Sequence, residues 1–146
     1  MTIRIAEKID FEAIKKLVKA HAKFEKVSAL SDNNLDKLSN YIFSTDVVKC
    51  LVVELNNEII GYATFMKQFS TWDANYYLYL DCLYLSEKTR GKGIGAQIMN
   101  KIKVYAKSIN CSEIQWQTPD FNKEAIDFYK KLGADSKTKE RFNWKI

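Results

Sequence analysis

The chain has 146 residues and a mass of 17.0 kDa, a length that predicts one domain, residues 1–146, around one hydrophobic core. Hydrophobic residues make up 47% and charged residues 28%, values that argue against a disordered chain. The net charge of +5 is compatible with a nucleic-acid ligand, but the lysines are scattered along the sequence. This scatter favours a basic surface and an anionic small-molecule ligand, and we expect no nucleic-acid partner.

Neither a signal peptide nor a membrane span is expected. The N-terminal residues "MTIRIAEKID" lack the apolar centre of a signal peptide. No apolar run approaches the roughly 20 residues that cross a bilayer. The chain has three cysteines, Cys50, Cys82 and Cys111, an odd number without the spacing of metal ligands. We therefore expect reduced thiols, a cytoplasmic location, no membrane contact and no metal.

The first half of the chain predicts two helices and three strands. Residues 2–7 alternate like a strand, and Asp10 is expected to cap a helix that includes His21 among its inward positions. A second, shorter helix starts at Ser31. The sequence then predicts two strands, 49–55 and 59–69, joined by a hairpin turn at "NNE".

The second half alternates between strands and helices. "YLYLDCLYL", residues 77–85, is an almost wholly apolar strand of the kind that is buried on both faces. A glycine-rich stretch precedes a helix over 96–109, and a strand is expected over 111–118. A helix over 122–134 ends at Gly133, and "ERFNWKI" is expected to be a final strand. The order β-α-α-β-β-β-α-β-α-β predicts a mixed α/β (α+β) fold with helices on the faces of its sheet.

The stretch "TRGKGIG" contains three of the five glycines of the chain, Gly91, Gly93 and Gly95. A Walker loop is excluded, because no Gly-Lys-Ser/Thr follows the spacer. A dinucleotide fingerprint is disfavoured, because only about fifty residues follow and a second mononucleotide half would not fit. Consecutive N–H groups at a helix N-terminus form an anion-binding concavity, and bulky side chains at these three positions would hold a pyrophosphate off the main chain. A glycine-rich helix entry without a ligand stays as the alternative.

Residues 90–95 also fit the pattern Q/R-x-x-G-x-G/A. With "YLYLDCLYL" before it and "FNKEAIDFYKKLGA" after it, this loop resembles the pyrophosphate-binding region of the GCN5-related N-acetyltransferase (GNAT) superfamily. "HAKFE" and "NCSEIQW" make the chain similar to the diamine (spermidine/spermine-type) N-acetyltransferases and their bacterial relatives. The resemblance implies a mixed, mostly antiparallel sheet of about six or seven strands, which splays around the cofactor cleft and is flanked by about four helices.

The same resemblance implies acetyl-CoA as cosubstrate, a small-molecule amine as partner and a homodimer. The residues that match the family's cofactor positions are Leu83, Tyr84, Leu85, Arg90, Gly91, Lys92, Gly93, Ile94, Gly95, Ala96, Asn122, Lys123 and Ala125. The residues that match positions lining the amine pocket in the branch are Phe24, Glu25, Asp81, Gln115, Trp116, Gln117 and Arg141. The strand that carries Gln115 is expected to splay from the strand that carries Leu80, which leaves a cleft for the coenzyme.

Two residues are implied as catalytic. A primary amine with a pKa near 10.4 is only roughly 0.05% neutral at pH 7, a penalty of about 4–5 kcal/mol, so the site must remove a proton. Asp81 is the candidate acceptor of that proton, directly or through water, and Tyr129 is the candidate donor to the coenzyme A sulfur. Asp81 could instead pair with a cation or sit at a strand bulge, and Tyr129 could belong to the core. His21 is interpreted as structural.

The acceptor amine stays open. The branch commonly has a second acidic residue where this chain has Cys82, which argues against a long polyamine. A smaller diamine, an amino-acid-like amine such as thialysine, or a peptide amine is compatible with the sequence. The rival functions are a catalytically silent coenzyme A-binding module and a basic nucleic-acid binder. Retention of Asp81, Asn122 and Tyr129 together favours the enzyme.

Overall fold

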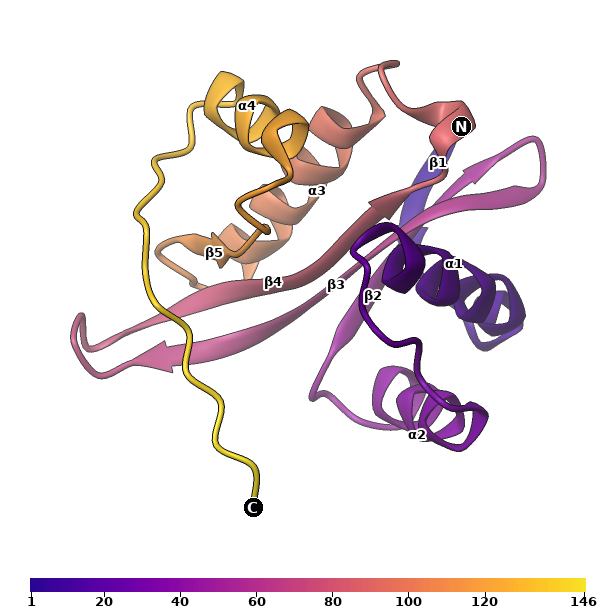
Figure 1. Cartoon of the computed structure of the whole chain (residues 1–146), viewed down its shortest axis with the longest axis horizontal. Coiled ribbons are helices and arrows are strands. Elements are labelled where there is room, and N and C mark those ends of the chain that lie inside the picture. The colour runs from indigo at the N-terminus through magenta and orange to yellow at the C-terminus, as the bar shows by residue number, and fades with distance from the viewer.

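The computed structural model describes residues 1–146 apart from the side chain of Lys88. Within this described part, five strands and four α-helices follow one another along the chain (Figure 1). They are β1 (Thr2–Ile5), α1 (Phe11–Phe24), α2 (Asp32–Phe43), β2 (Lys49–Leu55), β3 (Glu58–Ser70), β4 (Asn75–Leu85), α3 (Ile94–Ser108), β5 (Ile114–Trp116) and α4 (Lys123–Lys131). Two short 3-10 turns, Lys8–Asp10 and Glu87–Thr89, precede α1 and α3.

The strands form a single sheet in the order β1-β2-β3-β4-β5. The first four strands pair antiparallel, and β5 joins β4 in parallel. Helices α1 and α2 cover one face, while α3 and α4 lie on the other (Figure 1). Each pair of helices buries an apolar core against its face, because the helices are amphipathic and turn their apolar side to the sheet. The predicted mixed, mostly antiparallel class is confirmed.

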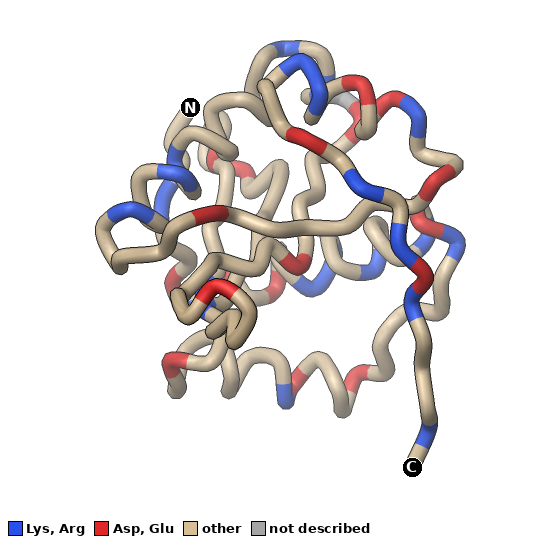
Figure 2. Tube along the Cα trace, turned by 90° about the vertical axis from the view of Figure 1, so that its left-hand side faces the viewer, with Lys and Arg blue, Asp and Glu red and all other residues tan. Residues whose placement is uncertain are grey.

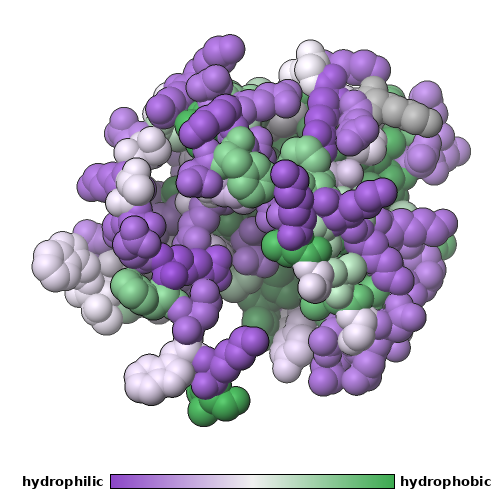
Figure 3. All heavy atoms as spheres, viewed as in Figure 1, coloured by the Kyte–Doolittle hydropathy of each residue, from purple (hydrophilic) through white to green (hydrophobic). Residues whose placement is uncertain are grey.

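Charged and polar side chains cover the outside of these layers. Basic and acidic residues are interspersed along the trace in Figure 2 rather than gathered by sign. In Figure 3 hydrophilic side chains cover most of the visible face, and hydrophobic ones show mainly near its centre. The positive net charge is therefore spread over the elements in view.

The β2–β3 hairpin has the tight turn that the sequence predicts. Asn56 and Asn57 have φ values of 50° and 62°, so both central residues adopt the left-handed conformation of a type I′ turn. Asparagine tolerates this conformation better than most residues. The turn therefore fixes the register in which Leu55 faces Glu58.

Strand β4 contains a bulge at Asp81. Thr64 of β3 faces Cys82, but the next residue, Phe65, faces Leu80, so Asp81 is an extra residue without a partner. The bulge changes which residues point to the α3 face. Leu78 and Leu80 belong to that core before the bulge, and the odd-numbered Leu83 and Leu85 pack against it afterwards.

Strands β4 and β5 stay paired over three residues only. Leu78, Tyr79 and Leu80 face Ile114, Gln115 and Trp116, and β4 then continues to Leu85 paired with β3 only. The predicted splay therefore begins after Leu80. Beyond that point one edge of β4 is free, and a cleft opens between it and the segment that leads to α4.

Three predictions about local structure are wrong, and with them the expected number of strands. The final strand over residues 140–146 does not form, which leaves five strands rather than six or seven. Its apolar side chains Phe142, Trp144 and Ile146 are exposed, and the segment does not join the five-stranded sheet. The strand expected over 111–118 shortens to Ile114–Trp116. Asp10 precedes α1 but does not cap it, because its carboxylate binds Arg4 and the N–H of Glu7 instead.

Candidate functional site

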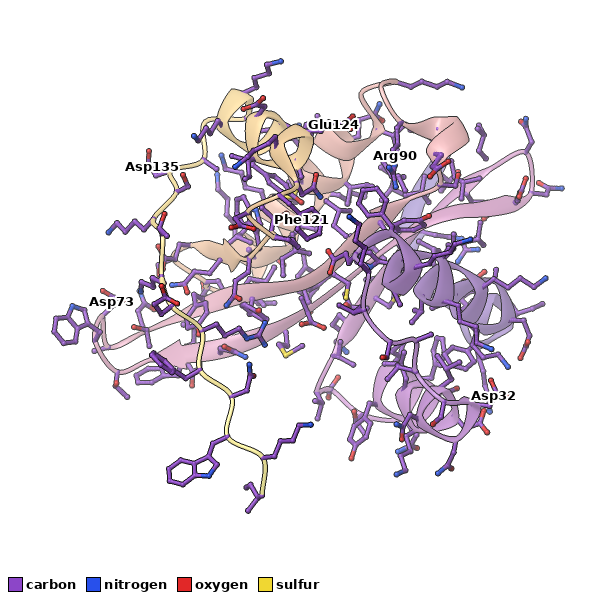
Figure 4. The ribbon with its side chains drawn as sticks, in the orientation of Figure 1. Asp32, Asp73, Arg90, Phe121, Glu124 and Asp135 are labelled. Atoms are coloured by element: carbon purple, nitrogen blue, oxygen red, sulfur yellow. The ribbon has the colours of Figure 1, made fainter. Side chains whose placement is uncertain are left out.

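A cavity of about 400 Å³ lies where β4 and β5 separate. Its walls come from the end of α1, the second half of β4, the loop before α3, the segment after β5 and the start of α4. The predicted site residues that line it are Phe24, Glu25, Asp81, Leu83, Tyr84, Leu85, Arg90, Gly91, Gly93, Ile94, Gly95, Trp116, Gln117, Asn122, Ala125 and Tyr129. In Figure 4 Arg90 and Glu124 lie near one end of this region, far from Asp32 and Asp73.

The glycine loop presents bare backbone to the cavity. Gly91 and Gly93 have φ values of 74° and 72°, and a Cβ added at either would meet nothing within 4 Å. Glycine is thus required at these two positions mainly because the backbone is left-handed there, a conformation that other L-amino acids rarely adopt. Gly93 is also the N-cap of α3, and no described side chain caps this helix N-terminus. Its N–H groups and helix dipole can therefore bind an anion.

Gly95 lines the cavity and also has a packing role that the sequence did not predict. A Cβ at this position would lie 2.9 Å from Cζ of Phe128, a separation that requires the ring to move. The glycine therefore lets the first turn of α3 pack closely against α4. A side chain at position 95 would clash with Phe128, so the packing of α3 against α4 already requires a glycine here.

Asp81 is exposed at the rim of the cavity. Because the bulge leaves it without a strand partner, its carboxylate is not buried in the apolar strand as the sequence implied. The nearest polar contact is the thiol of Cys82, 3.8 Å from Oδ2. Among the described residues, no ion pair involves Asp81. The carboxylate is therefore accessible to a cation in the cavity.

A second carboxylate, Glu25, lies at the end of α1 and contacts His21 one turn earlier. His21 Nε2 is 3.2 Å from Oε1 of Glu25, and Nδ1 is 2.9 Å from the hydroxyl of Tyr62. The imidazole also stacks on Tyr84, with ring centroids 5.1 Å apart. Burial is the main cause that lowers the pKa of His21, and Glu25 opposes this shift.

Arg90 joins the glycine loop to α1. Its guanidinium lies 4.3 Å from the centre of the Phe24 ring and 5.5 Å from that of Tyr84. Its Nε donates a hydrogen bond of 3.1 Å to the carbonyl of Leu85 at the end of β4. This residue therefore touches three sides of the cavity at once.

Tyr129 lies on the opposite wall, on α4. Its ring packs against Trp116 and Phe128, with centroids 5.0 and 5.1 Å away. Burial, with a smaller contribution from Glu25, raises the pKa of Tyr129 to about 12. The hydroxyl therefore keeps its proton at neutral pH and can act as a donor.

Asn122 caps the helix that carries Tyr129. Its Oδ1 accepts a hydrogen bond of 3.2 Å from the N–H of Ala125. The side-chain oxygen is thus occupied within the protein. A ligand would meet the side-chain NH₂ group or the main chain of this turn.

Five predicted residues do not line the cavity: Lys92, Ala96, Lys123, Gln115 and Arg141. Gln115 points away because side chains alternate along β5, and it binds Glu113 instead. Arg141 lies on the extended C-terminal segment and reaches the cavity indirectly. Its Nη1 donates to Oε1 of Gln117 over 3.4 Å.

Sequence reasoning missed six lining residues: His21, Leu80, Thr89, Thr118, Glu124 and Phe128. One signal was available for His21, because it stands four residues before Glu25 and therefore on the same side of a helix. The other five flank predicted site residues in the sequence. For these five residues, only the three-dimensional course of the backbone determines which side chains face the cavity.

Two further properties concern the described residues only. They contain no group of three or more His, Cys, Asp and Glu side chains that could hold a metal ion. Every helix that they form is too short or too polar to span a bilayer.

Comparisons with known proteins show the family and the fold of this chain. The model of the Acetyltransferase (GNAT) family matches residues 14–134. The thialysine N-epsilon-acetyltransferase of Bos taurus is 32% identical over 93% of this chain and 85% of the relative. A human spermidine/spermine N(1)-acetyltransferase-like protein 1 is 26% identical over 90% of this chain and 20% of its own length. The solved structure of an aminoglycoside N-acetyltransferase in complex with CoA superposes with a TM-score of 0.85 at 17% identity, covering 99% of this chain and 93% of that one.

Proposed function

This chain belongs to the acetyltransferase (GNAT) family, and we propose that it transfers the acetyl group of acetyl-CoA to a primary amine of a small amino-acid-like diamine such as thialysine. The expected enzyme class, an N-acetyltransferase, is confirmed by the family match and the relatives. The observation that carries the finer proposal is the placement of two carboxylates, Glu25 and Asp81, in the same cavity as Tyr129 and the glycine loop.

The glycine loop fits the coenzyme. The open N-terminus of α3 and the bare backbone of Gly91 and Gly93 would meet the pyrophosphate. The free edge of β4 beyond Leu80 offers main-chain groups to an extended pantetheine arm. When bound, acetyl-CoA would supply a thioester whose carbonyl carbon an amine can attack. A backbone N–H between Leu83 and Leu85 would then meet the charge that develops on the acetyl oxygen.

The remaining steps belong to side chains. Glu25 and Asp81 attract the ammonium group of the acceptor, and Asp81 takes one of its protons, directly or through water, and passes it to solvent. The freed nitrogen forms the new N–C bond while the C–S bond breaks, and the nitrogen releases its second proton to solvent as the amide forms. Tyr129 gives its hydroxyl proton to the departing sulfur and regains a proton from solvent. Positioning contributes the most, since holding the reactants together is worth about 7–11 kcal/mol.

The proposed acceptor class follows from the charges at the cavity. A long polyamine needs a row of acidic groups, whereas Cys82 stands beside Asp81 and burial raises the pKa of its thiol to about 11. That thiol stays neutral and does not attract a second ammonium. Gln117 lines the cavity and accepts a hydrogen bond from Arg141, the cation that we propose as the partner of an α-carboxylate. An amino acid with a side-chain amine combines both charges. The 32% identity to a thialysine N-epsilon-acetyltransferase supports this choice.

The test measures release of free thiol from acetyl-CoA with thialysine, lysine, ornithine, putrescine, spermidine, an aminoglycoside and a short peptide. We expect turnover with the amino-acid-like amines at higher kcat/KM than with spermidine. Asp81→Asn should reduce kcat, while Asp36→Asn, a change on the exposed surface of α2, should leave it unchanged. Spermidine as the best acceptor would contradict the acceptor class. Coenzyme binding without turnover of any amine would contradict the activity.

A further inference from the structure

The only histidine of the chain, His21, is one of the residues that line the cavity. His21 has a side chain that is 12% exposed, and both of its ring nitrogens have partners. One partner, Tyr62, is buried on β3 at 2% exposure. The other, Glu25, faces the cavity. The imidazole therefore connects a buried hydroxyl to the carboxylate that is proposed to bind the amine.

The partners of the two ring nitrogens favour one position for the proton, because the Glu25 carboxylate near Nε2 can only accept a hydrogen bond. Burial raises the pKa of Tyr62 far above its usual range, so its hydroxyl keeps its proton. When this O–H donates to Nδ1, the single proton of the neutral imidazole must be on Nε2. Nε2–H then donates to the ionised Glu25, which makes a charge-assisted hydrogen bond. Every group in the series Tyr62–His21–Glu25 is satisfied in this arrangement.

The ring is also held in its plane. Tyr84 stacks on it at an interplanar angle of 25°, and Tyr62 meets its edge at 71°. Tyr84 belongs to β4, the strand that carries Asp81. The imidazole is thus fixed to the sheet, while Glu25 is the C-cap residue that ends α1. Without this contact the Glu25 side chain, one third exposed, would have several rotamers available.

We propose that His21 is a positioning residue for the acceptor amine: it holds the Glu25 carboxylate toward the cavity as the Nε2–H tautomer that Tyr62 selects. The inference rests on the proposed function and adds a determinant of amine affinity and of its pH dependence. His21 acts through Glu25 and is not itself a catalytic residue.

A pH dependence follows from the charges around the ring. Glu25 of α1 and Asp81 of β4 favour the imidazolium, and Arg90 of the glycine loop opposes it. Tyr62, whose burial raises its pKa, and Tyr84 also face the ring. Burial outweighs these charges, and the imidazole is neutral at pH 7. Below its pKa the ring becomes a cation that pairs with Glu25 and competes with the substrate ammonium. Amine affinity should therefore fall as the pH falls through the pKa of His21.

The first experiment is nuclear magnetic resonance of protein labelled with ¹⁵N-histidine, after removal of any affinity tag. One histidine gives one pair of ring nitrogen signals, so the assignment is immediate. We expect the neutral ring to carry its proton on Nε2 and to titrate below 6.5. Tyr62→Phe should shift the population toward the Nδ1–H form, and Glu25→Gln should lower the pKa further. A neutral ring protonated on Nδ1, or a pKa that ignores Glu25→Gln, would overturn the inference.

The second experiment separates positioning from packing. His21→Leu should raise the KM of the amine about tenfold, the effect of losing one hydrogen bond to a charged group, with the KM of acetyl-CoA unchanged. His21→Gln keeps an N–H donor and should restore most of the affinity for the amine. The fall in amine affinity at low pH should vanish in this variant, because glutamine does not titrate. His21→Leu added to Glu25→Gln should have little further effect, because the two changes remove the same contact.

Val18→Ala is the matched control, since Val18 packs in the same α1 core away from the cavity. It should lower stability and leave both KM values unchanged. Equal losses for His21→Leu and His21→Gln, without a change in the pH profile, would show a packing role only. If the wild-type protein acetylates no amine, the proposed function fails, and the resonance experiment still decides whether His21 holds Glu25.

Discussion

The guanidinium of Arg90 lies 4.3 Å from the centre of the Phe24 ring. Arg90 opens the glycine loop, and Phe24 ends the helix that carries Glu25. The contact therefore joins the wall proposed to bind the coenzyme to the wall proposed to bind the amine. Two subsites that are far apart in the sequence share one cation–π pair, in addition to the hydrogen bond from Arg90 to Leu85.

The first prediction concerns this pair. Arg90→Ala should raise the KM of the amine as well as that of acetyl-CoA, each by about three- to tenfold, because it removes a stacked cation worth about 1 kcal/mol at each wall. Arg90→Lys keeps the charge but loses the planar group that stacks on Phe24, so it should restore little of the amine affinity. Steady-state kinetics with each substrate varied in turn would measure both values. An effect on acetyl-CoA alone would show that the two walls act independently.

Tyr129→Phe is expected to lower kcat by about 10²-fold with small changes in both KM values, because it removes a proton donor and little volume. Tyr41→Phe, an exposed tyrosine on α2, is the matched control and should have no effect. Since the pKa of Tyr129 is raised to about 12, the hydroxyl stays protonated throughout the range from pH 7 to 10. Deprotonation of Tyr129 should therefore cause no loss of rate between pH 7 and 10. A loss of rate in this range that the wild-type protein shows and Tyr129→Phe lacks would contradict the donor role.

The two kinds of glycine in the loop should respond differently to alanine. Gly95→Ala brings a methyl group against Phe128 and should destabilise the fold by about 1–3 kcal/mol, with recovery when Phe128 becomes Leu. Gly93→Ala meets no atom but forces alanine to a φ of 72°, at a cost of about 1–2 kcal/mol that Phe128→Leu should not recover. Urea unfolding of the single and double variants would measure this difference. Recovery of both by Phe128→Leu would refute the distinction.

A partly buried ion pair near the N-terminus should make stability depend on pH. Arg4 donates two hydrogen bonds to Asp10, of 2.7 and 2.9 Å, and holds the pKa of that carboxyl below its usual range. A lowered pKa in the folded state means that the contribution is complete above the unfolded pKa and is lost as the pH falls through the folded one. Asp10→Asn should cost about 1.5–3 kcal/mol at pH 7, the value of a hydrogen bond to a charged group, and progressively less toward pH 3.

Urea unfolding at several pH values would test this, with Asp46→Asn as control. Asp46 also pairs with a lysine, Lys49, but is 95% exposed, so its loss should not change stability measurably. A penalty for Asp10→Asn that stays constant down to pH 3 would contradict the linkage.

Much of the fold is predictable from local patterns. Strand β2 forms over residues 49–55 as expected, and the turn at Asn56 and Asn57 follows from residues that tolerate positive φ. Ser31 caps α2 through the N–H of Asn34, as its residue type predicts. These features depend on neighbours in the sequence, so the sequence alone suffices.

The errors arise where pairing decides the outcome. The segment over residues 140–146 alternates like a strand, yet a strand needs an edge to pair with, and β5 offers only three residues. Likewise, the side chain of Asp10 had a competing partner in Arg4, six residues away in the sequence. The homodimer and the cytoplasmic location stay predictions.

For the site, the family resemblance identified most of the residues that line the cavity, but it did not explain why some of them lie there. The bulge at Asp81 was visible in the sequence, because the leucines occupy even positions at 78 and 80 and odd positions at 83 and 85. His21 was interpreted as structural because a single histidine on an apolar helix face is often buried. Its contact with the cavity depends on Tyr62 and Tyr84, which come from distant strands.

The extra residue in β4 also limits how this chain can vary. With Asp81 in place, Leu83 and Leu85 turn toward α3 and Tyr84 turns toward His21. Removing one residue there would exchange the two faces of the rest of the strand: the leucines would meet α1, and the Tyr84 ring would be pushed toward α3. Position 81 can therefore accept another amino acid more readily than a gap. Even a chain with no use for a carboxylate at that place would have to keep the number of residues in this strand.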